Sequence, residues 1–153
     1  MSSVLKPDCQ FRPMLENDLD AVMAIEPTIY LHPWTRGNFN DSLKAGHQAW
    51  VLTRQGEIIG YSLMSMVLDE AELLNISVAA PCQQQGLGRL LLAHMLEHAI
   101  TLGAAMVFLE VRASNAAAIA LYERASFVEV NVRRGYYPAE NGREDAVIMK
   151  VTL

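Results

Sequence analysis

Cysteine is scarce in this chain of 153 residues, which has only Cys9 and Cys82, far apart and in no CxxC pair. A disulfide scaffold needs more cysteines in a shorter chain, so we expect two reduced thiols. The chain also lacks any apolar run of the roughly 20 residues that span a bilayer. The segment Met1–Asp8 has neither the charged nor the apolar part of a signal peptide. These absences predict a cytoplasmic protein with no membrane contact.

Basic residues are in the minority, with 12 Lys and Arg against 17 Asp and Glu and a formal net charge of −5. Nucleic-acid-binding domains usually show a basic excess, so we expect no direct contact with nucleic acid. Intrinsic disorder is excluded by the hydrophobic share of 52%. This length is typical of one domain with its own core, and we expect residues 1–153 to form a single, monomeric domain.

The apolar periodicity changes along the chain from strands to alternating helices and strands. Alternation of period two predicts strands, and an apolar stripe repeating every three to four residues predicts helices. A mixed sheet with helices on its faces follows, an α/β (α+β) fold. Strands are expected at 9–15, 48–54, 57–66, 70–79, 105–111, 127–133 and 144–151, and helices from Asn17 to Pro27, at 35–45, between Gly88 and Gly103, and at 115–125 behind a Ser114 cap.

A glycine-containing loop, Gln83–Arg89, lies between a predicted strand and the longest predicted helix. Glycine lets backbone N–H groups approach an anion, and a helix N-terminus adds unpaired donors. The loop is therefore a candidate phosphate cradle, although a simple helix-starting turn explains the same residues. It is neither a Walker A loop nor a dinucleotide fingerprint, since no Gly-Lys-Ser/Thr follows and Leu91 stands where GxGxxG needs glycine.

The spacing Gln-x-x-Gly-x-Gly after a strand resembles the pyrophosphate loop of the GNAT acetyltransferase superfamily. Three further segments resemble its ribosomal-protein-alanine N-acetyltransferase branch, the RimI type, and together they extend the resemblance over most of the chain. They are Leu68-Asp69-Glu70-Ala71, the run from Leu109 through Glu-Val-Arg-Ala-Ser-Asn to Tyr122, and Tyr136-Tyr137-Pro138 with the nearby 142–146.

The resemblance implies a mixed sheet of about seven strands with about four helices, in which central strands splay apart into a V-shaped slot for acetyl-CoA. No metal is implied. The residues that would contact acetyl-CoA are Ile76, Ser77 and Val78 through their backbone, Gln84, Gln85, Gly86, Leu87, Gly88 and Arg89 at the pyrophosphate, and Asn115.

Acetyl transfer to an amine needs a base, because a protonated amine has no lone pair. Glu110 ends an apolar strand, and desolvation at such places tunes carboxyl groups for proton transfer. The resemblance implies that Glu110 is the general base and that Tyr122 is the general acid for the leaving thiolate. Without the resemblance, a Glu110 ion pair with Arg112 or another cation and a packed Tyr122 explain these residues equally well.

The resemblance implies a substrate with a basic tail, the N-terminal alanine of a small-subunit ribosomal protein. An acidic cluster of Asp69, Glu70 and Glu72 could attract such a peptide, or it could be ordinary surface charge. Tyr136 and Tyr137, expected on a loop between the last two strands, could line the peptide slot. Other enzymes of this fold acetylate other protein N-termini, lysine or small amines, and a catalytically silent CoA-binding partner is a further alternative.

Two positions depart from the family pattern, and one pair of residues imitates a metal site. Ser126 stands where a helix-terminating glycine is common, which predicts strain, and Gly135 stands where a polar residue is usual. His94 and His98 are four apart on one helix, as metal ligands would be. Without a third ligand in the pattern, we interpret them as a solvated helix face.

Overall fold

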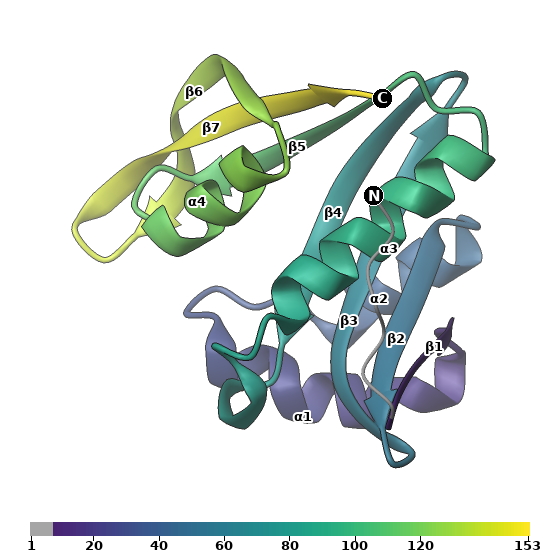
Figure 1. Ribbon diagram of the computed structural model, residues 1–153. Coiled ribbons are helices and arrows are strands. Elements are labelled where there is room, and N and C mark those ends of the chain that lie inside the picture. Colours follow the sequence, from purple (N-terminus) through teal and green to yellow (C-terminus); the bar gives the residue numbers. More distant parts are fainter. Residues whose placement is uncertain (1–7) are drawn as a thin grey trace.

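The computed structural model describes residues 8–153, which form a seven-stranded sheet and four α-helices (Figure 1). The strands are β1 (Cys9–Pro13), β2 (Gln48–Arg54), β3 (Glu57–Val67), β4 (Glu70–Val78), β5 (Met106–Arg112), β6 (Val128–Ala139) and β7 (Gly142–Thr152). The helices are α1 (Leu19–Ile29), α2 (Arg36–Lys44), α3 (Leu87–Thr101) and α4 (Ala116–Arg124). The predicted fold class is confirmed.

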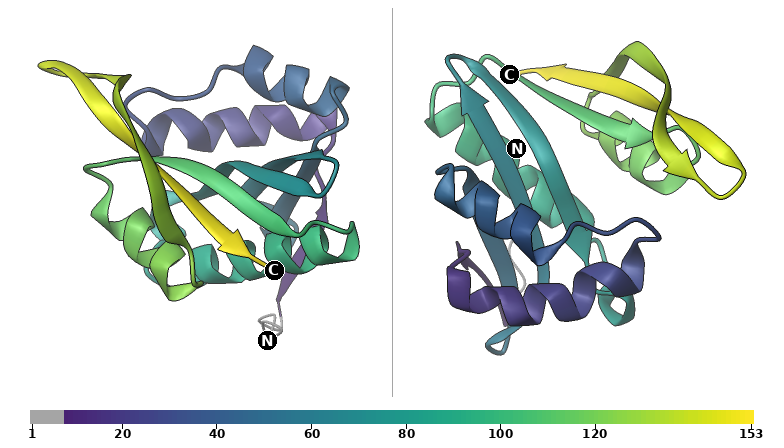
Figure 2. Two further views of the ribbon diagram at one scale, coloured as in Figure 1. Left: turned by 90° about the horizontal axis from the view of Figure 1, so that it is seen from above. Right: turned by 180° about the vertical axis from the view of Figure 1, so that it is seen from behind.

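The sheet has the order β1-β2-β3-β4-β5-β7-β6, and every neighbouring pair is antiparallel except β4 and β5. Helices α1 and α2 cover one face and α3 and α4 the other, as the view from above shows (Figure 2). Each face has its own apolar core, because the strands alternate their side chains between the two faces. Within the described chain, no helix is long and apolar enough to cross a membrane.

The parallel pair β4 and β5 separates partway along its length. The pairing runs from Glu70 and Met106 to Leu73 and Leu109, and the described chain shows no further pairing between them. At this point Leu74 is an extra residue in β4, where the register with β3 shifts, and such a bulge bends a strand. The predicted V-shaped opening of the sheet is confirmed, and the ribbons of β4 and β5 diverge there (Figure 1).

The boundaries predicted for the first helix were wrong. A 3₁₀ turn precedes α1, and Asp18, rather than Asn17, accepts the hydrogen bond of a free backbone group, that of Leu15 at 2.8 Å. Pro27 lies inside the last turn of α1 instead of ending it. A proline loses only its own N–H bond to the preceding turn, so the residues after it can continue the helix.

Two predictions for the second half of the chain were also wrong. Asn115, not Ser114, caps α4, since its side-chain oxygen accepts the N–H of Ala118 at 3.2 Å. Tyr136 and Tyr137 lie within β6 rather than on a loop, because β6 extends through a bulge between Arg133 and Tyr137 before the turn to β7. The extra residues of this bulge interrupted the alternation that would have predicted a strand.

The interpretation of His94 and His98 as a solvated face was wrong. His94 stacks on Phe11, with ring centroids 4.0 Å apart, and both histidines meet the edge of Trp50. His98 Nε2 lies 2.8 Å from the side-chain oxygen of Gln48. The helix carries these rings because its turns pack on β1 and β2, and the pair belongs to an aromatic cluster. In residues 8–153, no group of three or more His, Cys, Asp or Glu could hold a metal.

Candidate active site

A cavity of about 370 Å³ lies where β4 and β5 separate. Its walls come from the end of α1, the segment between α1 and α2, β4, β5, α4 and β6. Five of the predicted site residues line it, namely Ile76, Glu110, Asn115, Tyr122 and Tyr137. Segments that are far apart in the sequence therefore meet at one place, as the topology of the splayed sheet requires.

Glu110 is the first residue of β5 beyond its pairing with β4. Its carboxylate is partly buried, with a side-chain exposure of 20%, and Oε1 lies 3.8 Å from Nη2 of Arg133. The ion pair with Arg112 is not formed, because Arg112 contacts Glu144 at 3.1 Å instead. Glu110 is thus a carboxylate at a cavity wall with one exposed cationic neighbour, a position in which it can exchange protons with a bound molecule.

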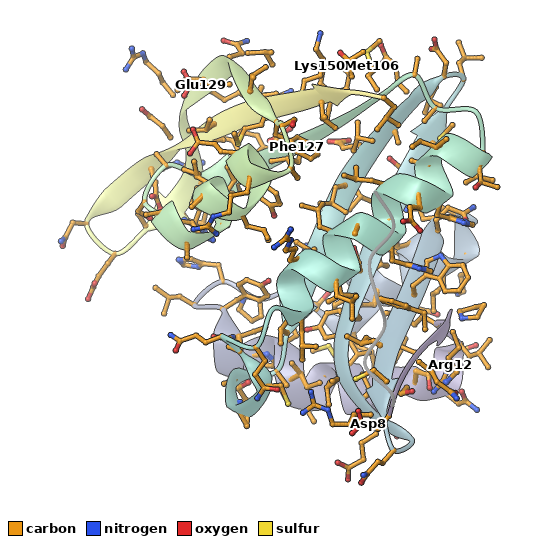
Figure 3. All side chains as sticks on the ribbon, viewed as in Figure 1. Asp8, Arg12, Met106, Phe127, Glu129 and Lys150 are labelled. Atoms are coloured by element: carbon orange, nitrogen blue, oxygen red, sulfur yellow. The ribbon has the colours of Figure 1, made fainter. Side chains whose placement is uncertain are left out.

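Tyr122 lies on α4, on the opposite side of the same cavity. It is buried and packs against Phe127, which follows the helix, with ring centroids 5.7 Å apart (Figure 3). Burial raises the pKa of Tyr122 above its usual value, so the phenol keeps its proton throughout the neutral range. A buried phenol of this kind can donate a proton or a hydrogen bond but cannot act as a base.

The predicted glycine loop forms the start of α3. Gly86 has φ of 78°, and in the described part of the chain no side chain caps this helix, so its first N–H groups face outward. A Cβ at Gly88 would meet the side chain of Leu121 at 3.6 Å, which places the helix start beside the neighbour of Tyr122. The loop and the cavity are therefore adjacent, as one extended ligand would require.

The side chains of the loop do not all face a ligand. Leu87 is buried in the core, and the side-chain oxygen of Gln85 accepts a hydrogen bond from Arg54 at 3.0 Å. Gln84 has φ of 63°, and Arg89 is exposed. Backbone N–H groups, with the exposed cation, are the parts of this loop that can hold an anion.

The end of β4 already has several protein partners. The hydroxyl of Tyr30 donates to the carbonyl of Ile76 at 2.9 Å, and Gln83 donates to the carbonyl of Val78 at 3.0 Å. Ser77 is buried, with Oγ 2.7 Å from the hydroxyl of Tyr30. The structure therefore fixes this stretch of strand from the side of α1, and the two carbonyls are not free acceptors.

A second cavity of about 340 Å³ adjoins the first, and Leu109 and Glu110 line both. Glu70, Glu72 and Arg133 also line it. Burial, and then the negative charge of Glu110, raises the pKa of Glu72. Of the three predicted acidic residues, the structure brings two beside Glu110.

The third acidic residue and one of the two tyrosines lie outside both cavities. Asp69 is in the turn between β3 and β4, where its carbonyl accepts the N–H of Ala105 at 2.7 Å. Tyr136 is 44% exposed and packs on Tyr137, with ring centroids 5.0 Å apart. The sequence pattern does not separate these residues from their neighbours that line the cavities.

Tyr137 is held at the cavity by contacts with Arg112. The guanidinium group lies 4.5 Å from the centre of the Tyr137 ring and donates to the carbonyl of Pro138 at 2.8 Å. Burial, and then the charge of Glu110, raises the pKa of Tyr137 to about 12. The β6 bulge that directs the ring contains Gly135, with φ of 59°, whose N–H donates to the carboxylate of Asp145 at 2.9 Å.

Four cavity residues were missed by the sequence analysis: Glu26, Tyr30, Trp34 and Asn75. Glu26 is 1% exposed although it is ionisable, and it lies on the same face of α1 as Leu19 and Val22. A carboxylate at a core position of a helical stripe is a signal that the sequence contains, because such a group is buried only with hydrogen-bond partners.

The cavity at the splayed strands, with an uncapped helix start beside it, defines a transferase site for a CoA thioester and an amine. The acetyltransferase (GNAT) family model matches residues 19–127, and the chain belongs to this family. It is an N-acetyltransferase, as its named relatives are.

The relatives are similar over nearly their whole length. The [ribosomal protein bS18]-alanine N-acetyltransferase of Escherichia coli is 44% identical over 136 residues, which are 89% of this chain and 92% of the relative. The enzyme of the same name from Haemophilus influenzae is 37% identical over 137 residues, 89% of this chain and 93% of the relative. A crystal structure of the Escherichia coli enzyme has a TM-score of 0.90 at 42% identity and covers 94% of this chain and 93% of its own.

A more distant neighbour is Arabidopsis thaliana NAA60 in complex with acetyl-CoA. It has a TM-score of 0.84 at 20% identity and covers 95% of this chain and 99% of its own. At this identity the likeness shows the fold alone. The GNAT family uses acetyl-CoA, and the fold match extends to a structure that contains it.

Proposed function

We propose that this enzyme transfers the acetyl group of acetyl-CoA to the N-terminal alanine of ribosomal protein bS18, the substrate named for its relatives. The observation that carries the proposal is the meeting of Glu110 and Tyr122 at one cavity in the splayed sheet. The 44% identity to the Escherichia coli enzyme supports the choice of substrate. The proposal assigns this activity to one domain, residues 1–153, acting as a monomer in the cytoplasm.

Glu110 acts as the general base in this proposal. Its carboxylate takes a proton from the α-ammonium group of the peptide, directly or through a water molecule, so that the amine regains its lone pair. The reference pKa of an α-amine is near 8, against about 10.4 for lysine, and a carboxylate can therefore deprotonate the chain terminus more readily near neutral pH. The partial burial of Glu110 at the cavity wall supports this role.

Tyr122 acts as the general acid. The carbonyl carbon of the thioester gains the N–C bond and loses the C–S bond, and the Tyr122 hydroxyl supplies the proton for the departing thiolate. Its raised pKa keeps that proton in place until the sulfur needs it. The position of Tyr122 across the cavity from β5 suits a donor on the thioester side.

Acetyl-CoA would bind along the line from the start of α3 to the cavity. The outward N–H groups from Gln84 to Gly88 would hold the pyrophosphate, and Arg89 would add positive charge. Asn115 at the start of α4 and the backbone of β4 at Ile76, Ser77 and Val78 would flank the pantetheine arm. Since the carbonyls of Ile76 and Val78 already accept protein hydrogen bonds, N–H groups are the better candidates here.

The peptide would approach from the side of the second cavity. Glu70 and Glu72 line that cavity beside Glu110, and Asp69 lies in the adjoining turn. Together they would attract a basic tail, as opposite potentials do across an interface. Tyr137, with Tyr136 packed on it, would form the wall near the hairpin of β6 and β7.

Incubation of the enzyme with acetyl-CoA and three amines tests the substrate class. The amines are a basic hexapeptide that begins with alanine, the same peptide with a blocked α-amine and an internal lysine, and a small polyamine. We expect free thiol and an acetylated α-amine with the first peptide alone. Acetylation of the other two amines contradicts the substrate, and binding of acetyl-CoA without thiol release supports a catalytically silent protein.

A further inference from the structure

A buried carboxylate that is not part of the proposed chemistry lies beside the cavity. Glu26 of α1 is 1% exposed. Its Oε2 accepts the backbone N–H of Trp34 at 2.9 Å, and its Oε1 accepts the hydroxyl of Tyr61 at 2.7 Å and the amide of Asn75 at 3.3 Å. Hydrogen bonds of this number are needed to bury a carboxylate, and bonds to charged groups are stronger than neutral ones.

The three donors come from three different parts of the fold. Tyr61 is in β3, Asn75 is in β4 directly after the bulge, and Trp34 is in the segment between α1 and α2. Trp34 and Asn75 line the cavity, and so does His32 of the same segment. Glu26 therefore ties one wall of the cavity, which has no helix or strand of its own, to the splayed sheet.

The same segment is tied to β4 a second time. The hydroxyl of Tyr30 donates to the Ile76 carbonyl and lies 2.7 Å from Oγ of Ser77, which donates to the side-chain oxygen of Asn75 at 2.6 Å. Asn75 in turn donates to Glu26, so the network closes on itself. Both ends of the segment 30–34 are fixed to one strand by side chains alone.

We propose that Glu26 is a positioning residue for the peptide substrate, which holds the segment 30–34 against β4 and so shapes the pocket for the first residues of the peptide. This inference rests on the proposed function for the identity of the substrate. The uncapped start of α3 has no hydrogen bond to Glu26. The effect of Glu26 therefore falls on peptide binding, and acetyl-CoA binding and the chemical step are unaffected.

Glu26→Gln is the variant that tests the inference. It keeps the size of the side chain but replaces one of two acceptor oxygens by an amide that donates, so one of the three donors is left facing another donor. We expect the KM for an alanine-starting basic peptide to rise by roughly tenfold, as the loss of one hydrogen bond to a charged group predicts. The KM for acetyl-CoA and kcat should stay within about twofold, which is the additive scatter of independent sites.

Asp18→Asn is the matched control. Asp18 is also buried, with two hydrogen bonds from Arg12 at 2.7 and 2.8 Å and one from the Leu15 N–H at 2.8 Å. Arg12 lies on β1, at the edge of the sheet away from the opening between β4 and β5 (Figure 3). We expect this variant to lose stability while its KM for the peptide stays unchanged. Equal rises in peptide KM for both variants overturn the inference, because a general loss of stability then explains them.

A measurement on the wild-type enzyme covers the case in which Glu26→Gln does not fold. Hydrogen exchange of the Trp34 amide, followed by NMR, should be much slower than in an unstructured peptide although Trp34 lies outside helices and strands. Exchange at the unstructured rate overturns the inference. If the wild-type enzyme does not acetylate the alanine peptide, the proposed function fails, and the exchange rate still decides whether Glu26 holds the segment.

Discussion

The carboxylate of Glu110 lies 3.8 Å from the guanidinium group of Arg133, and the two residues line the same cavity. Arg133 has a side-chain exposure of 53% and lies over the ring of Tyr136, with the guanidinium carbon 5.2 Å from the ring centre. An exposed ion pair of this length contributes little to stability. The cation therefore leaves Glu110 open to a stronger partner, such as the ammonium group of a bound peptide.

Glu110→Gln should lower kcat by roughly a hundredfold near neutral pH, the usual contribution of a general base. The loss should shrink above about pH 9, where an α-amine with a reference pKa near 8 is already deprotonated and needs no base. Initial rates of thiol release between about pH 6 and pH 9.5 measure this. A loss that is independent of pH contradicts the role of Glu110 as base.

Arg133→Gln is the control for that variant, because it breaks the same ion pair and keeps the carboxylate. Its kcat should change by less than about fivefold, as expected for an exposed pair. If both variants lose activity equally, the ion pair rather than the base explains the effect.

Tyr122→Phe should slow turnover by roughly a hundredfold with little change in the binding of acetyl-CoA. The ring stays packed on Phe127, and only the hydroxyl that faces the cavity is lost. Steady-state kinetics give the rate, and titration calorimetry with CoA gives the affinity. A normal kcat removes Tyr122 from the mechanism, whereas a large loss of CoA affinity makes it a binding residue.

Arg112→Lys should raise the KM for the peptide several-fold while acetyl-CoA binding stays unchanged. Lysine keeps the charge but lacks the planar group that reaches Pro138, Glu144 and the ring of Tyr137 together. The wall of the cavity at β6 should then be less well ordered. Arg143→Lys is the matched control, since Arg143 bonds the carbonyls of Gly135 and Tyr136 on the outside of the same hairpin.

The sequence carries the fold through its periodicity. The turn at Gln55 and Gly56, both with positive φ, was predicted from two residues between two alternating runs, and the structure confirms it. Ser126 has φ of 74°, so the strain predicted from a missing glycine is also present. Such features are local, and they depend on a few neighbouring residues.

The cavity depends on contacts that no local pattern contains. Glu26 and Asn75 are hydrogen-bonded across 49 positions of sequence, and Tyr30 and Ser77 lie together across 47. The β6 bulge, which brings Tyr137 to the cavity, breaks the period on which strand prediction relies. Glu110 and Tyr122 could be singled out only because the resemblance assigned them roles, and their meeting at one cavity is a property of the splayed sheet.

His94 should make the stability of the protein depend on pH. Burial, and then the neighbouring His98, lowers the pKa of His94, while Glu97 opposes this, and Nε2 of His94 is buried with no hydrogen-bond partner in residues 8–153. The unfolded chain, with a histidine pKa near 6.5, then takes up a proton at higher pH than the folded protein. Stability is therefore constant above about pH 7 and falls as the pH falls below about 6.5.

His94→Phe should flatten this part of the dependence, since phenylalanine can stack on Phe11 without a titrating group. Thermal unfolding at several values between about pH 5 and pH 8 measures the effect. Because His32 is exposed, His32→Phe should leave the slope unchanged. A slope that survives in the His94 variant assigns the dependence to other groups.

Ser126→Gly should stabilise the protein by roughly 1 kcal/mol, because glycine adopts the left-handed conformation without the strain of a side chain. Ser126 ends α4 with φ of 74° and is exposed, so no packing is lost. Ser114→Gly is the control: Ser114 is also exposed but is not among the residues with positive φ, so glycine there should destabilise slightly through the freedom of the unfolded chain. Urea unfolding of both variants gives the two free energies of unfolding. If Ser126→Gly is neutral or destabilising, the serine must gain from its own contacts what its backbone conformation costs.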